Sequence, residues 1–241
     1  MLYLSPKRKL LYVTDIIRPS RAPLGELNHL SCFLPGLLAL GAAAIRSSQP
    51  DAAERHMWAA QGLADTCWLT YAESRSGLGP ERVGFAKPGR RWVDALDVWE
   101  GKGRRGMPPG VGHARKTGWY GNKEYKILDA RYMLRPETIE SMYIMWRTTG
   151  DPKWRERGWA IFEAIEKHAR EGRAFASVQD VDQWKGHVEH MNDLPRLKYV
   201  YLLCLNEDIL PLDQWTFNTE AHPFPNFLWS EWEKNAFNIK A

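Results

Sequence analysis

The chain has 241 residues and a formal net charge of +4, and its balance of apolar and charged residues is that of an ordinary globular protein. Because acidic residues are spread through the sequence, the charge gives no reason to expect nucleic acid or an anionic membrane as a partner. The sequence has no apolar run long enough for a membrane span or a secretory signal. We therefore expect no membrane segment, and the length suits one large domain or two small ones.

The first part of the chain is predicted to form a short strand followed by two helices. Residues 10–16 are typical of a strand, and a loop rich in Pro and Gly follows them. The apolar stretch 27–45 predicts a buried helix. Residues 51–74 carry apolar side chains at helical spacing, and Asp51 is placed to cap this second helix.

Residues 84–121 differ from the rest in composition, because clustered Lys, Arg, Gly and Pro surround a single short predicted helix over 92–100. Basic runs of this kind mostly stay hydrated, so we interpret the stretch as an exposed basic loop insertion. The alternative is that it contacts an acidic partner.

Further helices are predicted in the second half of the chain. Pro136 suits the first turn of a helix that stops near Gly150, and the next helix is expected to be capped by Asp151 and ended by Gly172. The remaining predicted elements are a strand over 175–181, a helix around 194–205 and a partly extended tail over 215–226. Successive amphipathic helices separated by short strands favour an all-helical toroid or a paired-helix array, with a solenoid as the alternative.

Two acidic residues are the first candidates for chemistry. Glu137 and Glu140 are three residues apart at the predicted helix start, beside Arg135, so both carboxylates project from one face. Two acids that share a face can hold and deprotonate a water molecule. The alternative is that acidic side chains in a first helical turn only complement the helix macrodipole.

A second candidate lies in the tail, where the sequence FNTEAHPFP places Thr219, Glu220 and His222 close together in an irregular segment. Oxygen donors in irregular backbone suit a hard cation such as calcium. The alternative is that these side chains bond only to neighbouring backbone groups.

A series of segments carries a resemblance to a known family, and they occur in the order LLYVTDI, LNHLSCFLPGLLALGA, TCWLTY, GLGPE, YMLRPETIES, MWRTTGDPKWRERGWAIFEAIEKHAR, LKYVYLL and FNTEAHPF. In them the chain resembles the class I α-1,2-mannosidases of glycoside hydrolase family 47. The resemblance covers most of the chain except the basic insertion, and it corresponds to the later half of the family's catalytic domain. It implies a mainly α fold, namely a partial (αα)7 barrel of helix pairs with short strands or hairpins, as a single incomplete domain over 1–241.

The resemblance also implies an activity, which is the calcium-dependent, inverting removal of terminal α-1,2-linked mannose from high-mannose N-glycans or glycoproteins. Glu137 would be the general base that activates water, and Glu140 would help to hold that water. Thr219 would ligate the calcium ion, and Glu220 beside it would contribute to the sugar site. The residues that match positions lining the glycan pocket are Arg135, Glu81 and His29.

The three cysteines allow at most one disulfide and one free thiol. Cys32 and Cys67 match the pair that forms the family's disulfide, which would leave Cys204 free. A disulfide implies an oxidising compartment, so the resemblance places the protein in the secretory pathway, in the endoplasmic reticulum or Golgi, or outside the cell.

The chain also departs from the family pattern. Inverting hydrolysis needs a second carboxyl group on the opposite side of the sugar, and in the family that acid comes from the earlier half, which this sequence lacks. Before LKYVYLL the family carries an aromatic residue and a pocket glutamate, where this sequence has only HMNDLPR, and Asn28 replaces an aspartate. We therefore expect a mannosidase fragment that is inactive alone and that has a missing N-terminal half as a partner. The alternatives are a non-catalytic glycan-binding module or a helical scaffold without a ligand.

Overall fold

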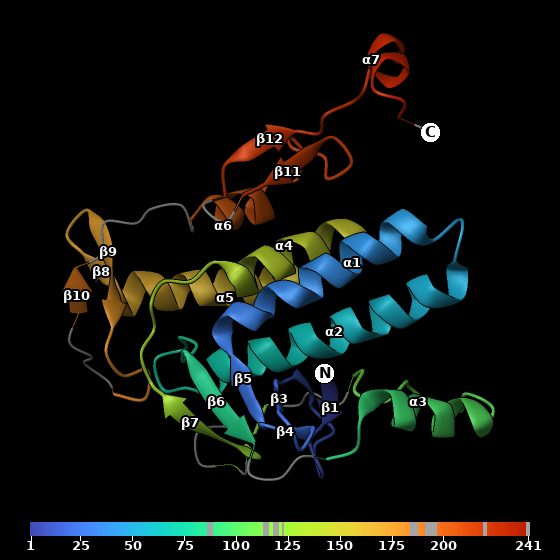
Figure 1. Cartoon of the computed structure of the whole chain (residues 1–241). Coiled ribbons are helices and arrows are strands. Elements are labelled where there is room, and N and C mark those ends of the chain that lie inside the picture. The colour runs from blue at the N-terminus through green and yellow to red at the C-terminus, as the bar shows by residue number, and fades with distance from the viewer. Residues whose placement is uncertain are drawn as a thin grey trace. The chain divides into compact units, whose positions relative to one another are not determined.

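The computed structural model describes residues 1–85, 89–112, 116–117, 121, 123–183, 188–190, 197–218 and 221–239. The chain divides into two compact units, Met1–Cys204 and Leu205–Ala241, which are described separately. Helices dominate the first unit and short strands connect them (Figure 1). None of the helices in the described residues is both long and apolar enough to cross a membrane.

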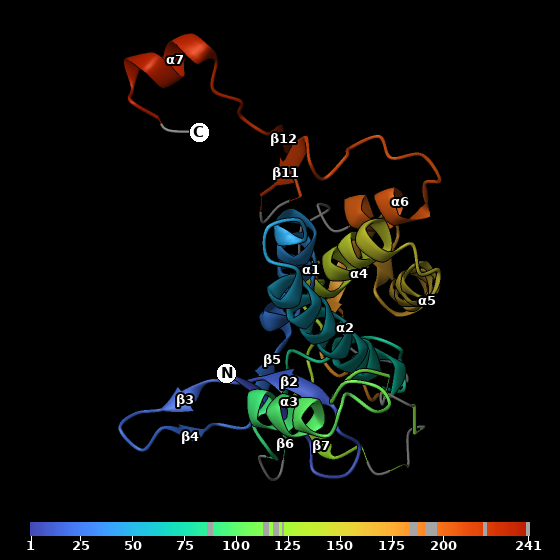
Figure 2. The ribbon, with the colours of Figure 1, turned by 90° about the vertical axis from the view of Figure 1, so that its right-hand side faces the viewer.

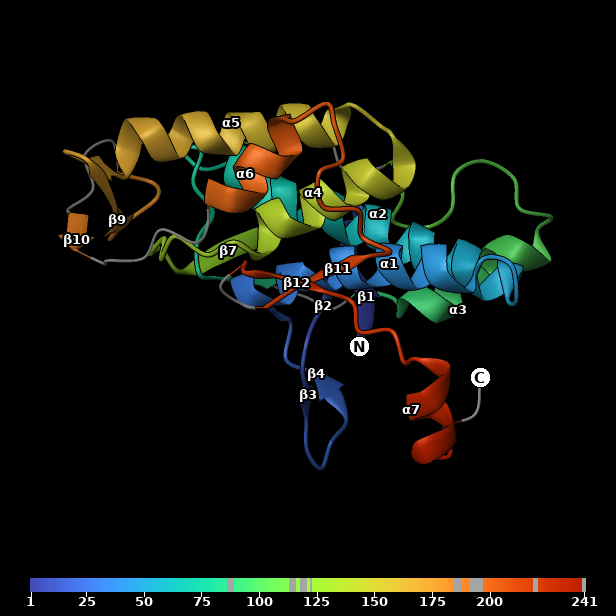
Figure 3. The same cartoon turned by 90° about the horizontal axis from the view of Figure 1, so that it is seen from above.

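The first unit is built around helices that pack side by side, as Figures 2 and 3 show from two directions. They are α1 (Leu34–Ile45), α2 (Pro50–Ala72), α4 (Glu137–Thr149), α5 (Lys153–His168) and α6 (Leu197–Cys204). Helix α4 contacts each of the other four. The α1–α4 contact is close because Gly36 has no side chain, since a Cβ there would lie 2.9 Å from Ile144 Cδ1. The predicted helix-rich architecture is therefore confirmed for this unit.

Short antiparallel strands pack around the helices. The strands of the first unit are β1 (Leu2–Leu4), β2 (Leu11–Val13), β3 (Ile16–Ile17), β4 (Ala22–Pro23), β5 (Glu26–Asn28), β6 (Arg82–Phe85), β7 (Tyr125–Asp129), β8 (Arg170–Glu171), β9 (Ala174–Val178) and β10 (Val188–His190). For example, β2 packs against α2 and β9 packs against α5. Strands β5, β6 and β7 form one sheet with β6 in the middle, and β1 pairs with β2. The ring of Tyr12 on β2 stacks on that of Phe85 on β6, with the centroids 3.9 Å apart, which joins the hairpin to the sheet.

The stretch predicted as an exposed basic loop is partly built into the core. Its predicted helix is confirmed as α3 (Trp92–Gly101), and the prediction of exposure is wrong for one face of that helix. Trp92 and Leu96, four residues apart, are buried in a cluster that also contains Leu4 and Leu63. This burial depends on contacts with β1 and α2, which are remote in sequence and do not show in the local composition.

Several helix ends differ from the sequence prediction. Residues 27–33 form the end of β5 and a 3₁₀ helix (His29–Phe33), so α1 begins only at Leu34. Helix α2 is preceded by Gln49 as its N-cap, and Asp51 lies in its first turn rather than at the cap. Helix α5 ends at His168, before the glycine predicted to end it. The stop of α4 is confirmed, because Gly150 follows it in the left-handed conformation with φ of 67°.

The predicted disulfide is present between Cys32 and Cys67, and Cys204 is a free, exposed thiol. The bond ties the 3₁₀ helix to the C-terminal third of α2. It therefore fixes the backbone next to His29, which is the first residue of that 3₁₀ helix.

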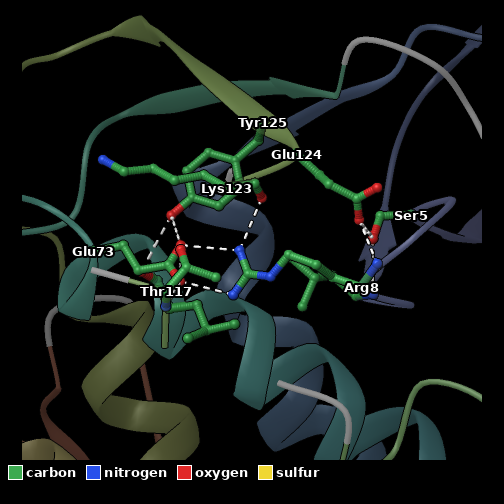
Figure 4. Close-up of polar contacts among 9 residues, drawn as sticks. Ser5, Arg8, Glu73, Thr117, Lys123, Glu124 and Tyr125 are labelled. Carbon is green, nitrogen blue, oxygen red and sulfur yellow. Dashed lines mark hydrogen bonds and ion pairs between the residues drawn. The ribbon is translucent and has the colours of Figure 1, made fainter. Parts of the chain in front are cut away.

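A buried ion pair anchors the C-terminal end of α2 to the strands (Figure 4). The Glu73 carboxylate, which is fully buried, accepts hydrogen bonds from both terminal nitrogens of Arg8, at 2.7 and 3.1 Å. The hydroxyl of Tyr125 on β7 and the backbone N–H of Thr117 also donate to it, at 2.8 and 2.9 Å. Burial opposes the charged form, but these donors outweigh it and hold the pKa of Glu73 below its ordinary value.

The second unit contains a hairpin and a short helix. Strand β11 (Trp215–Phe217) pairs with β12 (Pro223–Pro225), which agrees with the extended tail expected from sequence. Helix α7 (Glu231–Ala236) begins with a capping box, in which Ser230 and Glu233 bond each other's backbone N–H.

Candidate active site

Three of the predicted site residues lie where α4 begins, namely Arg135, Glu137 and Glu140. Pro136 is the N-cap of this helix, Arg135 precedes it, and Glu137 and Glu140 occupy the first turn. Most of the helix that follows is buried, from Thr138 through Met145 apart from Glu140 itself. The acidic pair is therefore held by a rigid, well-packed element, and the positive end of the helix dipole favours its negative charge.

Glu137 faces His29, the first residue of the 3₁₀ helix. Its Oε2 lies 3.4 Å from His29 Nδ1, and the two side chains are 14% and 1% exposed. Neither of these two atoms has a hydrogen-bond partner with good geometry among the described residues. The two atoms therefore face each other within ion-pair distance but without a well-formed hydrogen bond.

Glu81 and Arg135 form a second pair beside the first. Arg135 Nε lies 2.6 Å from Glu81 Oε2. The backbone of Glu81 is fixed on both sides, because its carbonyl accepts from His29 N–H and its own N–H donates to the carbonyl of Arg131, both at 2.9 Å. The other carboxylate oxygen, Oε1, is buried without a hydrogen-bond partner among the described residues. It is therefore a buried acceptor whose hydrogen-bonding capacity the described residues leave unused.

Glu140 contacts Tyr199 of α6, whose hydroxyl donates to Glu140 Oε1 at 3.2 Å. Burial raises the pKa of Glu140 to about 7, and the neighbouring Glu137 charge adds to this rise while the Tyr199 hydrogen bond opposes it. Near neutral pH the side chain therefore exists in both protonation states. A carboxyl group poised in this way can give or take a proton at physiological pH.

Tyr71 contacts His29 of this cluster, and it was not predicted from sequence as a site residue. It is buried on α2, and its hydroxyl lies 2.5 Å from His29 Nε2. The hydroxyl of Thr138 is 3.4 Å from the same nitrogen. Tyr71 continues the apolar stripe of α2 four residues after Cys67, a pattern that indicates burial and nothing more specific.

The structure thus brings together the predicted residues of the first unit, His29, Glu81, Arg135, Glu137 and Glu140. The roles predicted for them stay predictions. Thr219 and Glu220, predicted for calcium and the sugar, lie outside the described residues. Within the described ranges no group of three or more His, Cys, Asp or Glu side chains is arranged to hold a metal ion. The calcium site therefore also stays a prediction.

Comparison with known proteins relates the chain to one enzyme family. The model of glycosyl hydrolase family 47 matches residues 2–226. The chain is 33% identical over 204 residues to mannosyl-oligosaccharide alpha-1,2-mannosidase IA of Drosophila melanogaster, covering 83% of this chain and 26% of that protein. It is 34% identical over 214 residues to mannosyl-oligosaccharide 1,2-alpha-mannosidase MNS3 of Arabidopsis thaliana, covering 83% and 32%.

The fold comparison agrees with the sequence comparison. The solved structure of an alpha-1,2-mannosidase from Trichoderma reesei is similar, with a TM-score of 0.68 and 26% identity over 93% of this chain and 43% of that one. The chain thus spans about a quarter to a third of the length of these two curated relatives, 26% and 32%. Because the family model covers far more than half of the sequence, the chain belongs to glycosyl hydrolase family 47.

Proposed function

We propose that the chain carries the base side of the active site of a calcium-dependent, inverting α-1,2-mannosidase that acts on high-mannose N-glycans. The observation that carries this proposal is the cluster at the start of α4, where Glu137 faces His29 and Glu81 pairs with Arg135. The two relatives are named mannosyl-oligosaccharide α-1,2-mannosidases, and these names supply the reaction class.

The chemistry follows from the free oxygens of the cluster. Glu137 is held at a helix start with its side chain partly exposed, so it can take a proton from a water molecule. Glu140, with a pKa of about 7, helps to hold that water. The Arg135–Glu81 pair presents a buried carboxylate oxygen, which suits a hydrogen bond from a sugar hydroxyl.

The calcium ion would be held by Thr219, and Glu220 would contribute to the sugar site. Oxygen ligands in an irregular segment are the kind that calcium prefers, which supports the assignment. When bound, the ion would supply electrostatic orientation of sugar hydroxyls and of the attacking water.

The second carboxyl group of an inverting enzyme must lie across the sugar, roughly 6.5 to 9.5 Å from the base. Glu140 does not suit that role, because it shares one helix face with Glu137 three residues away. We therefore propose that the leaving-group acid is not supplied by this cluster, and that the chain does not release mannose alone. The helices would then form part of an (αα)7 barrel, with the remaining helix pairs and the acid supplied by a missing N-terminal half. The Cys32–Cys67 disulfide supports a place in the secretory pathway.

Isothermal titration calorimetry with an α-1,2-linked mannose disaccharide tests the proposal. We expect binding in the presence of calcium, and loss of binding when EDTA removes the ion. Glu137→Gln should bind with similar affinity, because a near-isostere keeps the hydrogen-bonding shape of the side chain. The matched control is Glu156→Gln, which alters an acid in the first turn of α5, outside the cluster.

The binding experiment separates the alternatives when mannose release and thermal unfolding are measured on the same samples. Calcium-dependent binding with mannose release would contradict the inactive-fragment part of the proposal. Binding that ignores calcium would contradict the calcium site. No binding and no calcium-induced rise in thermal stability would leave the scaffold as the better account, because a ligand that binds only the folded state must stabilise it.

A further inference from the structure

The buried hydroxyl of Tyr71 lies 2.5 Å from His29 Nε2, and the direction of the hydrogen bond between them depends on the tautomer of His29. Burial, together with the nearby Tyr132 and the Glu137 and Glu81 carboxylates, raises the pKa of Tyr71 well above its ordinary value, so the phenol keeps its proton. The hydroxyl of Thr138 lies 3.4 Å from the same His29 nitrogen. Tyr71 can then donate its own proton to His29 Nε2.

The direction of this bond determines which nitrogen of His29 carries the proton. A neutral imidazole that accepts a hydrogen bond at Nε2 must carry its hydrogen on Nδ1. His29 Nδ1 is the atom 3.4 Å from Glu137 Oε2. Neither buried atom has a hydrogen-bond partner among the described residues, and a hydrogen on Nδ1 would place a donor rather than a lone pair against the carboxylate oxygen.

We propose that Tyr71 is a positioning residue, which holds His29 as the Nδ1–H tautomer so that the imidazole directs its N–H at the Glu137 carboxylate. The inference rests on the proposed function in taking Glu137 as the base. One oxygen of Glu137 is then held by the protein and the other is left for water. Tyr71 touches neither water nor sugar in this account, and it acts only through His29.

The packing of the Tyr71 ring indicates a second contribution. The ring lies directly against Gly79, where a Cβ would clash with it. Gly79 belongs to the GLGPE segment, whose last residue is Glu81. One side chain thus supports both the His29–Glu137 contact and the loop that carries Glu81. Tyr71→Phe keeps the ring and removes only the hydroxyl, so it separates the hydrogen bond from the packing.

Nitrogen NMR of the full chain labelled with ¹⁵N-histidine tests the proposal without any substrate. His29→Gln assigns the His29 signals. We expect wild-type His29 to carry its proton on Nδ1 at neutral pH. In Tyr71→Phe the ratio of the two tautomers should move toward Nε2–H by about tenfold, the factor that one net hydrogen bond is worth. Tyr125→Phe is the matched control, because it removes a buried hydroxyl that donates to Glu73 instead.

A wild-type His29 that carries its proton on Nε2 would overturn the proposal, and this result needs no variant to fold. A tautomer ratio in Tyr71→Phe within twofold of wild type would also overturn it, because Glu137 alone would then set the tautomer. A shift of equal size in Tyr125→Phe would mean a general structural effect and would contradict the specific role. Because tautomers are read without turnover, these outcomes are independent of whether the chain binds or hydrolyses a mannoside.

Discussion

Removing the Glu73 carboxylate is expected to destabilise the first unit strongly. The side chain is 0% exposed and its partner Arg8 is 12% exposed, so Glu73→Leu would remove the carboxylate that both terminal nitrogens of a largely buried guanidinium contact. Losing one member of a buried pair costs about 3 to 5 kcal/mol. Arg8 keeps its bond to the carbonyl of Lys123 at 2.9 Å, so we expect the lower end, about 3 kcal/mol.

The measurement is urea unfolding of the full chain followed by circular dichroism. Adding Arg8→Met to Glu73→Leu should recover part of the loss, because the buried charge of Arg8 is then removed as well. The control is Glu54→Gln, which breaks an ion pair with Arg104 whose side chains are both 45% exposed. That change should cost less than about 1 kcal/mol.

The pH dependence gives an independent check of the same ion pair. The pKa of Glu73 is lowered in the folded protein, so its contribution to stability is present above the ordinary pKa near 4.5 and is lost as the pH falls through the folded value. Glu73→Gln should flatten this acid-side loss. A cost for Glu73→Leu no larger than that of the Glu54 control would refute the reasoning.

Three further predictions follow from single contacts. Replacing Cys67 and its disulfide partner together by Ser should lower the free energy of unfolding by about 4 kcal/mol, because the bond spans 35 residues, and equal urea midpoints would contradict this. Tyr199→Phe should raise the pKa of Glu140 above its present value of about 7, because a hydrogen bond to the charged form is lost, and ¹³C NMR titration of labelled glutamate measures the shift. Gly36→Ala should cost about 1 to 3 kcal/mol in thermal unfolding, because its Cβ would lie 2.9 Å from Ile144 Cδ1, and an unchanged melting temperature would show that α1 and α4 can separate freely.

The elements that could be predicted from sequence are those whose signals are local. Pro136 and Gly150 bracket α4 because one suits a helix start and the other a left-handed C-cap, and each acts within its own turn. The helix at 92–100 was likewise found, since its apolar spacing is visible within ten residues. Its burial was not found, because that depends on β1, β2 and α2, which are remote in sequence.

The candidate site likewise combines a local feature, which could be predicted, with long-range contacts, which could not. Glu137 and Glu140 share one helical turn, so their joint position could be predicted from spacing alone. The Tyr71–His29 hydrogen bond joins residues 42 positions apart, and no local rule connects them. His29 and Glu81 were found only through the family resemblance, because the contact of Glu81 with Arg135 spans 54 positions and depends on how α2 and α4 pack. Long-range contacts of this kind are fixed by tertiary packing rather than by propensity.

The central claim, that this chain supplies the base but not the acid of a mannosidase site, is tested most directly by comparing two substrates. Fluoride departs without needing a proton, whereas a sugar oxygen must be protonated as it leaves. With calcium present, the chain alone should hydrolyse α-mannosyl fluoride in a reaction abolished by Glu137→Gln, and should release no mannose from an α-1,2-linked mannose disaccharide. Mannose release from the disaccharide, or fluoride release that survives Glu137→Gln, would contradict the claim.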